Sequence, residues 1–398
     1  MHTFRKRRFS VIGKLGIIGL FSSFAAAAVT TIWAVYLDSF IQNAAYVGFI
    51  ISFFTIIGIC AYIFLIPLVE KSSKSKLYSA VILIYIISYV LFALFPYIYV
   101  IIILGTIIAV ITSLEVTLFG IIVRDKTKRN HISENEGIVY TLLNLSWLIA
   151  PVLAGFVSNK YGMRSVFILG SVIFFSAFIF FKLFKIKDSR RTKKIDRNPL
   201  KPLISFFKKK ERIYTYFLGG GISFWWALIY IYMPIYIFES GFGEEFIGYF
   251  LGAVTIPLIF TEYYFAKLAG KKGFKKIFII GYFILAISAL SVFFISNIYL
   301  ILLILAMASF GAGMLEPTTE AHFFDIVNKN QRDKFYGPYN TAIDLNAFLG
   351  TSLSAVILLF LPFKFIFLLF SVAMFALVLT SSRIKNVIES RRTGKQNS

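Results

Sequence analysis

Twelve long apolar runs follow one another along the chain, and they constrain its fold more than any other feature of the sequence. Each is about 20 residues or longer, the length that a helix needs to cross about 30 Å of hydrocarbon. Strands of a membrane barrel would alternate apolar and polar residues, and these runs do not alternate. We predict an all-α integral membrane protein with twelve transmembrane helices. The runs cover residues 14–37, 45–69, 77–95, 97–123, 137–158, 165–184, 213–238, 246–268, 274–295, 298–326, 335–361 and 364–382.

Composition and the scarcity of reactive side chains argue against an enzyme. Hydrophobic residues make up 58% of the chain and charged residues 15%, whereas soluble domains average about 45–50% and about 25%. A membrane enzyme would need a nucleophile with a base, or a metal cluster, near one interface. The chain has three histidines, of which His2 and His131 lie at the terminus or in a loop, and one cysteine, Cys60, within a span. We therefore predict that the chain is not an enzyme.

The distribution of cations predicts the orientation in the membrane. The chain has 41 Lys and Arg against 19 Asp and Glu. If the N-terminus is cytoplasmic, all these cations except Lys160, Arg164 and Lys364 lie in cytoplasmic loops or termini. Lys and Arg are retained on that side, so we expect both termini in the cytoplasm and the protein in the cell membrane. Lipid headgroups explain the basic loops, and we expect no nucleic-acid partner.

The longest basic linker divides six spans from six. We expect an N-terminal six-helix bundle over residues 1–184, a cytoplasmic basic linker over 185–212, a C-terminal six-helix bundle over 213–382 and a cytoplasmic basic tail over 383–398.

The two halves repeat each other at an offset of about 200 residues. Several features come into register at this offset, which indicates a duplicated six-helix unit whose copies lie parallel. The matched pairs are Gly48 with Gly248, Lys71 with Lys271, Glu115 with Glu316, Gly137 with Gly337, Thr141 with Thr341, and Asn144 with Asp344.

Three segments resemble two signatures of the major facilitator superfamily. After the second span, Ile66-Pro67-Leu68-Val69-Glu70-Lys71-Ser72-Ser73-Lys74-Ser75 resembles the pattern Gly-x-Leu-Ala-Asp-Arg-x-Gly-Arg-Lys, and Ala266-Lys267-Leu268-Ala269-Gly270-Lys271-Lys272-Gly273-Phe274-Lys275 is its copy after the eighth. In the fifth span, Gly137, Ser146, Ala150, Pro151 and Gly155 resemble the spacing of a glycine-rich motif that the family associates with antiporters. Small residues at these positions let helices approach closely, and the proline bends the helix.

The resemblance implies a fold of two pseudo-symmetric six-helix bundles that rock about a central cavity. It also implies charged gates at the cytoplasmic helix ends. We expect Glu70, Lys71 and Arg124 to form one such gate, with Lys271 and Asp325 at the equivalent place in the second half.

Acidic residues in the middle of the spans point to a transport site. Each costs about 3 kcal/mol in mid-membrane, and no Lys or Arg lies deep within a span to compensate. The compensating cation is then a proton, a metal ion or a cationic substrate. These acids are Glu115, Glu262, Glu316, Glu320 and Asp344.

Glu316 is the central candidate. It shares a helix face with Glu320 and is the repeat mate of Glu115. Pro317 follows it and leaves a backbone carbonyl without its donor, as in the broken helices of transporter binding sites. In the resembled family, helices 1, 4, 7 and 10 line the cavity, which would place Glu115 and Glu316 on opposite walls. The alternative is that these acids only pack helices through hydrogen bonds.

Other predicted site residues are polar or aromatic. Asn144 and Asp344 are repeat mates in the fifth and eleventh spans, and Trp33 and Trp226 would stack on a flat or cationic ligand. His322 with Glu320 and Asp325 would make only a weak metal site, so we predict neither a metal nor another cofactor.

The preferred function is secondary active transport of a small molecule by alternating access. A Gly-x4-Gly-Lys-Ser/Thr signature for ATP is missing, so we expect that ATP does not drive transport. Because of the acids in the spans, we predict proton-coupled antiport, in which a monomer exports a cationic or amphipathic compound. Uptake or facilitated transport of a neutral solute, such as a sugar or metabolite, is the closest alternative. A non-transporting receptor or scaffold is a third.

Overall fold

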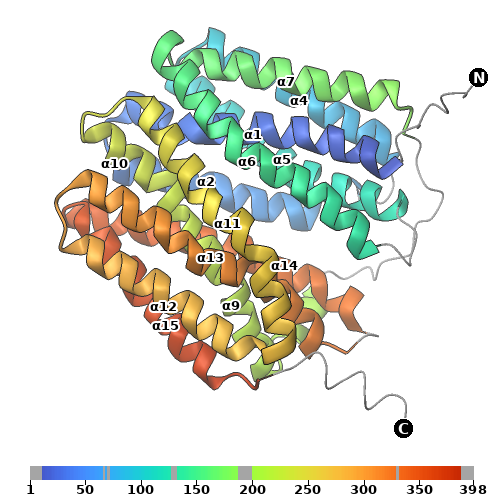
Figure 1. Ribbon diagram of the computed structural model, residues 1–398. Coiled ribbons are helices and arrows are strands. Elements are labelled where there is room, and N and C mark those ends of the chain that lie inside the picture. Colours follow the sequence, from blue (N-terminus) through green and yellow to red (C-terminus); the bar gives the residue numbers. More distant parts are fainter. Residues whose placement is uncertain are drawn as a thin grey trace, which may run out of the picture. The chain divides into compact units, whose positions relative to one another are not determined.

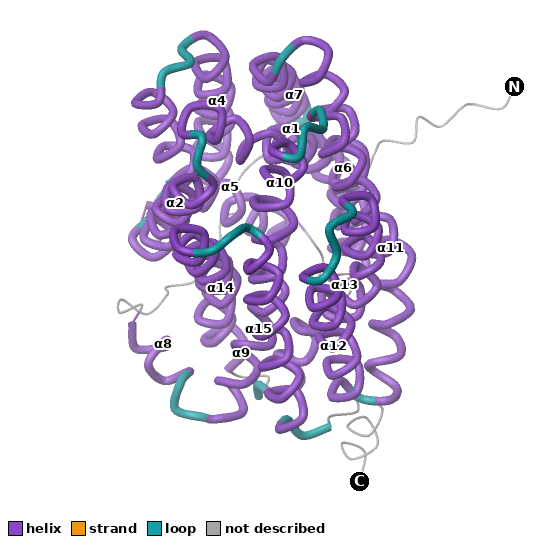
Figure 2. Tube along the Cα trace, turned by 90° about the vertical axis from the view of Figure 1, so that its left-hand side faces the viewer, coloured by secondary structure: helices purple, strands orange, loops and turns teal. Residues whose placement is uncertain are grey.

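The computed structural model describes residues 11–65, 68–69, 72–126, 132–186, 200–328 and 331–386. Within these ranges the chain is helices joined by short loops, and it contains no strand (Figure 2). The Glu70–Lys71 pair of the predicted gate lies outside the described residues.

Twelve helices of the described chain are long and apolar enough to span a membrane, which confirms the predicted fold class. They agree with the predicted runs to within a few residues at most ends. Their bounds are α1 (Val11–Ile41), α2 (Ala44–Phe64), α4 (Lys74–Leu94), α5 (Ile98–Lys126), α6 (Ile132–Tyr161), α7 (Met163–Leu183), the composite of α9 (Lys210–Ala227), η2 (Leu228–Tyr232) and α10 (Met233–Glu239), then α11 (Glu244–Lys272), α12 (Phe274–Phe293), α13 (Ile298–Ile326), α14 (Arg332–Phe360) and α15 (Lys364–Arg383). A short helix, α8 (Leu200–Phe206), lies in the linker.

Caps and glycines set several helix ends. The side chain of Ser73 accepts from Lys76 N at 3.3 Å at the start of α4, and Asn297 Oδ1 accepts from Leu300 N at 3.2 Å at the start of α13. Gly273 has a φ of +93°, which suits glycine, and lets the chain reverse between α11 and α12. Asn386 donates to Lys272 O at 3.3 Å and so satisfies a carbonyl at the end of α11.

Contacts divide the chain into two compact units. The first contains Met1–Ile32 and Cys60–Lys194, and the second contains Trp33–Ile59 and Ile195–Ser398. The C-terminal part of α1 and most of α2 therefore belong to the second unit by their contacts. In the second unit, for example, a Cβ on Gly48 would lie 2.9 Å from that of Ala355 in α14.

The first unit is built on α4, which packs against α5 and α7 (Figure 1). Aromatic rings fill the contact between α4 and α7, and Tyr85 stacks on Phe174 with centroids 4.5 Å apart. Gly170 lets the Tyr89 ring come close to α7, because a Cβ there would lie 2.9 Å from that ring. Close packing of aromatic and small residues, more than apolarity alone, stabilises helix pairs in lipid.

The second unit contains the closely packed pairs α12 with α15, α11 with α13, and α9 with α14 (Figure 1). The triplet Gly219-Gly220-Gly221 makes room on α9 for side chains and backbone of α12 and α14. In α14, Tyr339 lies against Gly219, while Ala342 and Asn346 lie against Gly220. In α12, Tyr282 lies against Gly221. These glycines permit close approach, and the irregular part of the span follows about two turns later.

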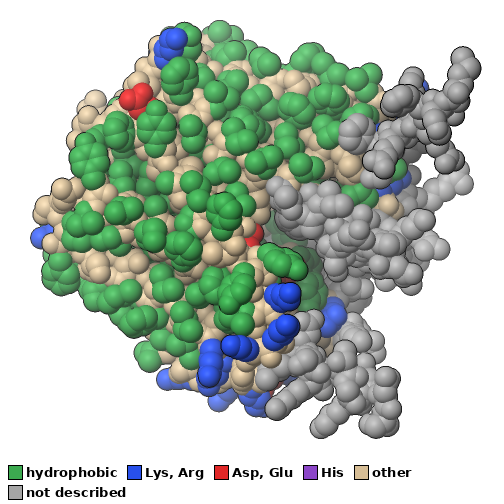
Figure 3. Space-filling model, in the orientation of Figure 1, with side chains coloured by type: hydrophobic (Ala, Val, Ile, Leu, Met, Phe, Trp, Pro, Cys, Tyr) green, Lys and Arg blue, Asp and Glu red, His purple; other side chains and the backbone are tan. Residues whose placement is uncertain are grey.

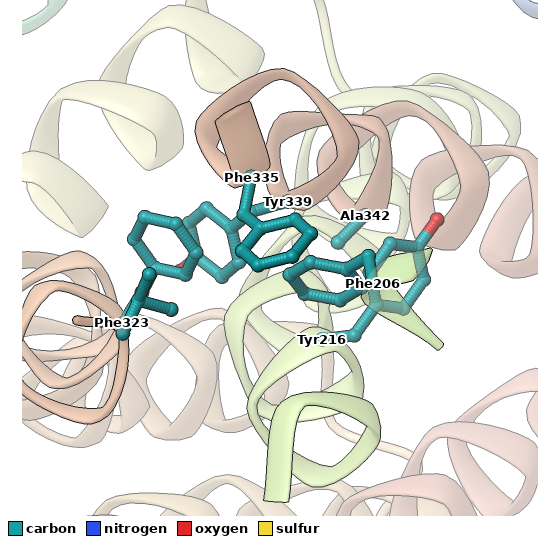
Figure 4. Close-up of a cluster of buried hydrophobic side chains, with 7 residues drawn as sticks. Phe206, Tyr216, Phe323, Phe335, Tyr339 and Ala342 are labelled. Carbon is teal, nitrogen blue, oxygen red and sulfur yellow. The ribbon is translucent and has the colours of Figure 1, made fainter. Parts of the chain in front are cut away.

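A cluster of buried, mostly aromatic side chains joins α8, α9, α13 and α14 in the second unit (Figure 4). Phe206 of α8 is fully buried in it, so the linker helix is anchored to the unit. The cluster, called here the aromatic plug, consists of Phe206, Tyr216, Phe323, Val327, Phe335, Tyr339 and Ala342.

Large apolar side chains cover most of the visible surface, and Lys and Arg lie mainly at helix ends (Figure 3). Phe260, Tyr263 and Phe360 are each about four-fifths exposed. Exposed apolar surface on this scale would be a liability in water and is what lipid-facing helices require.

Candidate functional site

Glu316 lies on α13 just after a stretch where that helix packs closely against α11 and α12, and its own side chain is exposed. A Cβ on Gly311 would lie 2.7 Å from Gly281 O of α12, and one on Gly313 would collide with Thr261 of α11. Small residues therefore hold α11 and α12 against α13 just before Glu316. Pro317 follows inside the helix, where it cannot donate to the preceding turn.

The carboxyl group of Glu316 meets aromatic side chains of the seventh span. The side chain of Trp226 hydrogen-bonds to the carboxyl group, and Tyr230 lies close enough to interact with it electrostatically. The two rings lie with centroids 5.5 Å apart. The structure thus brings together two residues that the sequence predicted for the site, Glu316 and Trp226, and adds Tyr230.

A second acid and a hydroxyl complete the surroundings of Glu316. Glu262 of α11 interacts electrostatically with Glu316, and the phenol of Tyr230 is hydrogen-bonded to Thr255 of α11. Side chains from α9, η2, α11 and α13 therefore converge, and we call Glu316, Trp226, Tyr230, Glu262 and Thr255 the acid–aromatic site.

A π-helical segment positions Tyr230. Leu228–Tyr232 has π geometry between α9 and α10, and such insertions are frequent at functional sites. The segment changes the direction of the side chains that follow Trp226. It is anchored at its far end, where Tyr232 Oη donates to Thr351 O of α14. The sequence analysis treated this span as one continuous helix and did not predict the segment.

Glu320 has a different environment. Its carboxylate accepts from Tyr336 Oη at 2.7 Å, which joins α13 to α14. Asp344 is half-buried on α14 and is close enough to Tyr216 of α9 to influence it electrostatically. Neither residue interacts with Glu316 in the way that Trp226 and Glu262 do, so their assignment to the same site stays a prediction.

His322 is a packed residue of α13. It is 2% exposed, its Nδ1 lies 3.3 Å from Thr215 Oγ1, and its ring lies 5.4 Å from that of Phe274 and 5.3 Å from that of Phe278. In the described chain no three His, Cys, Asp or Glu side chains come together as metal ligands would.

In the first unit, Glu115 of α5 is half-buried and has its own donor. Tyr78 Oη of α4 donates to Glu115 Oε1 at 3.4 Å and lies 3.5 Å from Ser22 Oγ of α1. The ring of Tyr78 packs on that of Phe181 at 5.0 Å. The sequence analysis missed Tyr78, because nothing in the sequence distinguishes it from the other tyrosines of the chain.

Asn144 and Trp33 lie apart from these contacts. Asn144 is half-buried on α6. Trp33 is half-buried on the outer part of α1, with its ring 6.2 Å from that of Phe54.

The small residues of α6 pack as their spacing predicts. Ser146 Oγ donates to Leu20 O of α1 at 2.9 Å, Ala150 and Gly155 are buried, and Pro151 lies inside the helix. Gly137 belongs to α6, but its surroundings are outside the described part of the chain.

The predicted gate is only partly described. Arg124 lies in α5, but its side chain is among those that the structure does not describe. Lys271 is exposed near the end of α11, and Asp325 is half-buried near the end of α13.

The model of the Major Facilitator Superfamily matches residues 15–273 and 226–395. The chain belongs to the major facilitator superfamily. A relative, an uncharacterized MFS-type transporter of Methanocaldococcus jannaschii, is 23% identical over 226 residues. That match spans 56% of this chain and 58% of the relative's length.

Solved transporters share the fold of this superfamily member. A POT family transporter in complex with 5-aminolevulinic acid aligns with a TM-score of 0.78 at 12% identity, covering 92% of this chain and 94% of that one. The nucleoside transporter NupG aligns with a TM-score of 0.73 at 14% identity, covering 93% of this chain and 98% of that one. Family and fold together indicate a multi-pass membrane transporter rather than an enzyme.

Proposed function

We propose that this transporter is a proton-coupled antiporter that exports a cationic or amphipathic compound, with Glu316 holding either the proton or the substrate. The observation that carries the proposal is the acid–aromatic site. Glu316 has Trp226 and Tyr230 beside it and Glu262 within electrostatic range. In the described chain no ion pair joins Glu316 to a Lys or Arg.

An acid in this setting is suited to exchanging one cation for another. An ionised carboxylate costs about 3 kcal/mol in the middle of a membrane span, and a proton or a cationic substrate removes that cost. The two aromatic faces add attraction for an organic cation, about 2 kcal/mol or more where water is excluded. A proton gains nothing from the aromatic rings, so the rings increase the affinity for an organic cationic substrate alone.

Exchange follows if proton and substrate cannot both occupy the carboxylate. Protonation removes the charge that holds the substrate and so lowers its affinity. Each ligand shifts the balance between states only by its difference in affinity for them. A proton gradient directed inward then drives the substrate outward, and the second acid, Glu262, is placed to receive the proton as it leaves Glu316.

Topology and assembly form part of the same proposal. Both termini lie in the cytoplasm and the protein acts as a monomer in the cell membrane, with two six-helix bundles over 1–184 and 213–382 that alternate access. The basic loops support this orientation. We also expect Glu115, Asn144 and Trp33 to take part in binding substrate or proton, and charged residues at the cytoplasmic helix ends to act as gates.

Transport of a neutral solute is the second candidate. Solved proteins of the same fold include one that transports nucleosides and one in complex with 5-aminolevulinic acid, so the fold does not by itself select cations. Under this alternative, Trp226 and Tyr230 stack on an uncharged ring and Glu316 only packs helices.

Proteoliposomes with an imposed pH gradient distinguish the two. Organic cations, amphipathic amines, sugars and nucleosides are offered in turn while the internal pH is recorded. A cationic compound should move protons in the opposite direction to itself, whereas Glu316→Gln should abolish this coupled movement and Glu244→Gln, at the outer start of α11, should retain it. Uptake of a neutral solute with no proton movement for any cation would refute the antiport proposal.

A further inference from the structure

A small pocket lies in the second unit where α9 begins and α13 ends, and Glu316 is not among the residues that line it. Its volume is about 50 Å³, and its polar lining comes from Lys209, Glu211, Arg212, Asn328 and Gln331. Sites for drug-sized ligands measure about 300–1,000 Å³. The pocket is thus too small for a transported substrate and large enough for a single compact ionic group.

Arg212 is a buried cation whose charge no carboxylate neutralises. Its side chain is 8% exposed, and its Nε has no hydrogen-bond partner. In the described chain Arg212 forms no ion pair. A buried guanidinium without an anion is strongly disfavoured, and each unpaired donor adds to that cost.

The aromatic plug holds the guanidinium by its faces. The Cζ of Arg212 lies 4.2 Å from the centre of the Phe335 ring and 5.7 Å from that of Phe206. Cation–π contacts of this kind orient the plane of the guanidinium but do not satisfy its N–H groups. The edge that carries these donors remains for a ligand in the pocket, where Gln331 and Asn328 add neutral hydrogen-bonding groups.

The start of α9 adds to the positive field. Lys209 precedes the helix and provides no side-chain cap. Its carbonyl accepts from the N–H groups of Arg212 and Ile213, so those of Lys210 and Glu211 are left for an external acceptor. Glu211 is the one acid among the residues that line the pocket. It forms an ion pair with Lys385, which follows α15, and Lys385 Nζ lies 3.0 Å from Glu211 Oε1. The side chain of Glu211 is 56% exposed, as expected for a group that points to solvent.

We propose that this pocket binds a phosphate group, either the phosphodiester of an anionic lipid headgroup or free phosphate. A guanidinium matches the geometry of phosphate oxygens, and the N-terminus of a helix favours the same charge. A bound phosphate would link the start of α9 to the ends of α13 and α14. It would stabilise the second unit without occupying the transport site, so the proposal is independent of the substrate.

Thermal unfolding of the purified full-length protein tests the proposal. Inorganic phosphate is titrated in neutral detergent, and in a second arm the protein is placed in phosphatidylcholine nanodiscs with and without phosphatidylglycerol. At least one arm should raise the unfolding temperature of the wild type. A response only to phosphatidylglycerol assigns the site to a lipid, and a response to both assigns it to the phosphate group itself.

Variants separate the pocket from general charge effects. Lys208→Gln removes an exposed cation next to the pocket and should respond as the wild type does. Arg212→Gln should bind the effective ligand about tenfold or more weakly, because a charge-assisted hydrogen bond is lost. Lys209→Gln, at an exposed lining residue, should show the same direction of change if Arg212→Gln fails to fold. An unchanged unfolding temperature in both arms, or equal responses in Lys208→Gln and Lys209→Gln, would overturn the proposal.

Discussion

Replacing Gly220 with alanine should loosen the contact between α9 and α14, because a Cβ there has no room. It would meet Nδ2 of Asn346 and the backbone oxygen of Ala342. A flexible side chain moves aside easily, but a backbone oxygen inside a helix does not. Asn346 Nδ2 also donates to that oxygen at 2.8 Å, so both atoms that oppose the new methyl group are tied to each other.

The size of the effect follows from two opposing terms. Overpacking a well-packed core costs about 1–3 kcal/mol, while alanine is a better helix former than glycine by about 1 kcal/mol. The free energy of unfolding should therefore fall by up to about 2 kcal/mol in Gly220→Ala. Gly120 of α5 has no neighbouring atom within 4 Å of a built Cβ, so Gly120→Ala should gain up to about 1 kcal/mol.

Unfolding of both variants in detergent, followed by tryptophan fluorescence, measures this difference. Gly220→Ala should unfold at a lower temperature than the wild type, and Gly120→Ala at the same or a higher one. If Gly220→Ala is as stable as Gly120→Ala, the close approach of α9 and α14 is wrong and the glycine triplet has another purpose.

Three further predictions concern single side chains. Phe206→Ala should destabilise the second unit by up to about 3–5 kcal/mol, since the ring is fully buried in the aromatic plug. Phe207→Ala, at a more exposed ring, should reduce stability much less in the same unfolding assay. Equal losses of stability in the two variants would contradict the anchoring of α8. Tyr78→Phe should cost about 1 kcal/mol through the hydroxyl that contacts Glu115 and Ser22, and a stability equal to that of wild type would argue that these long contacts contribute nothing. Trp226→Ala should weaken binding of a cationic substrate in an equilibrium binding assay, with Trp226→Phe intermediate, and identical affinities would remove the ring from the site.

The spans could be predicted from the sequence because their physical requirement is simple. About 20 apolar residues are enough to cross the hydrocarbon, and the runs that meet this requirement are separated by short polar, charged or proline-containing segments. The seventh span contains a π-helical segment that this reasoning did not predict. Leu228–Tyr232 itself contains neither glycine nor proline, but Pro234 follows in the first turn of α10. Proline cannot donate to the carbonyl four residues earlier, so the sequence carries a local signal for an irregularity that the prediction of one continuous helix did not use.

The candidate site was predictable in part. The unusual placement of Glu316 and the aromatic character of Trp226 made each a candidate, but their contact depends on how α9 packs on α13. Tyr230 follows Trp226 by four residues, a spacing that places both on one helix face, and this could have identified it. The role of Gly219-Gly220-Gly221 could not be read from composition, because a glycine allows bending and close approach alike.

The central claim is that Glu316 couples proton and substrate movement. The most direct measurement compares Glu316→Gln with wild type in proteoliposomes, first for export driven by a pH gradient and then for exchange of labelled against unlabelled cationic substrate at equal pH. We expect Glu316→Gln to lose the pH-driven flux entirely, while Glu244→Gln behaves as wild type in both assays. Undiminished pH-driven flux in Glu316→Gln would contradict the account.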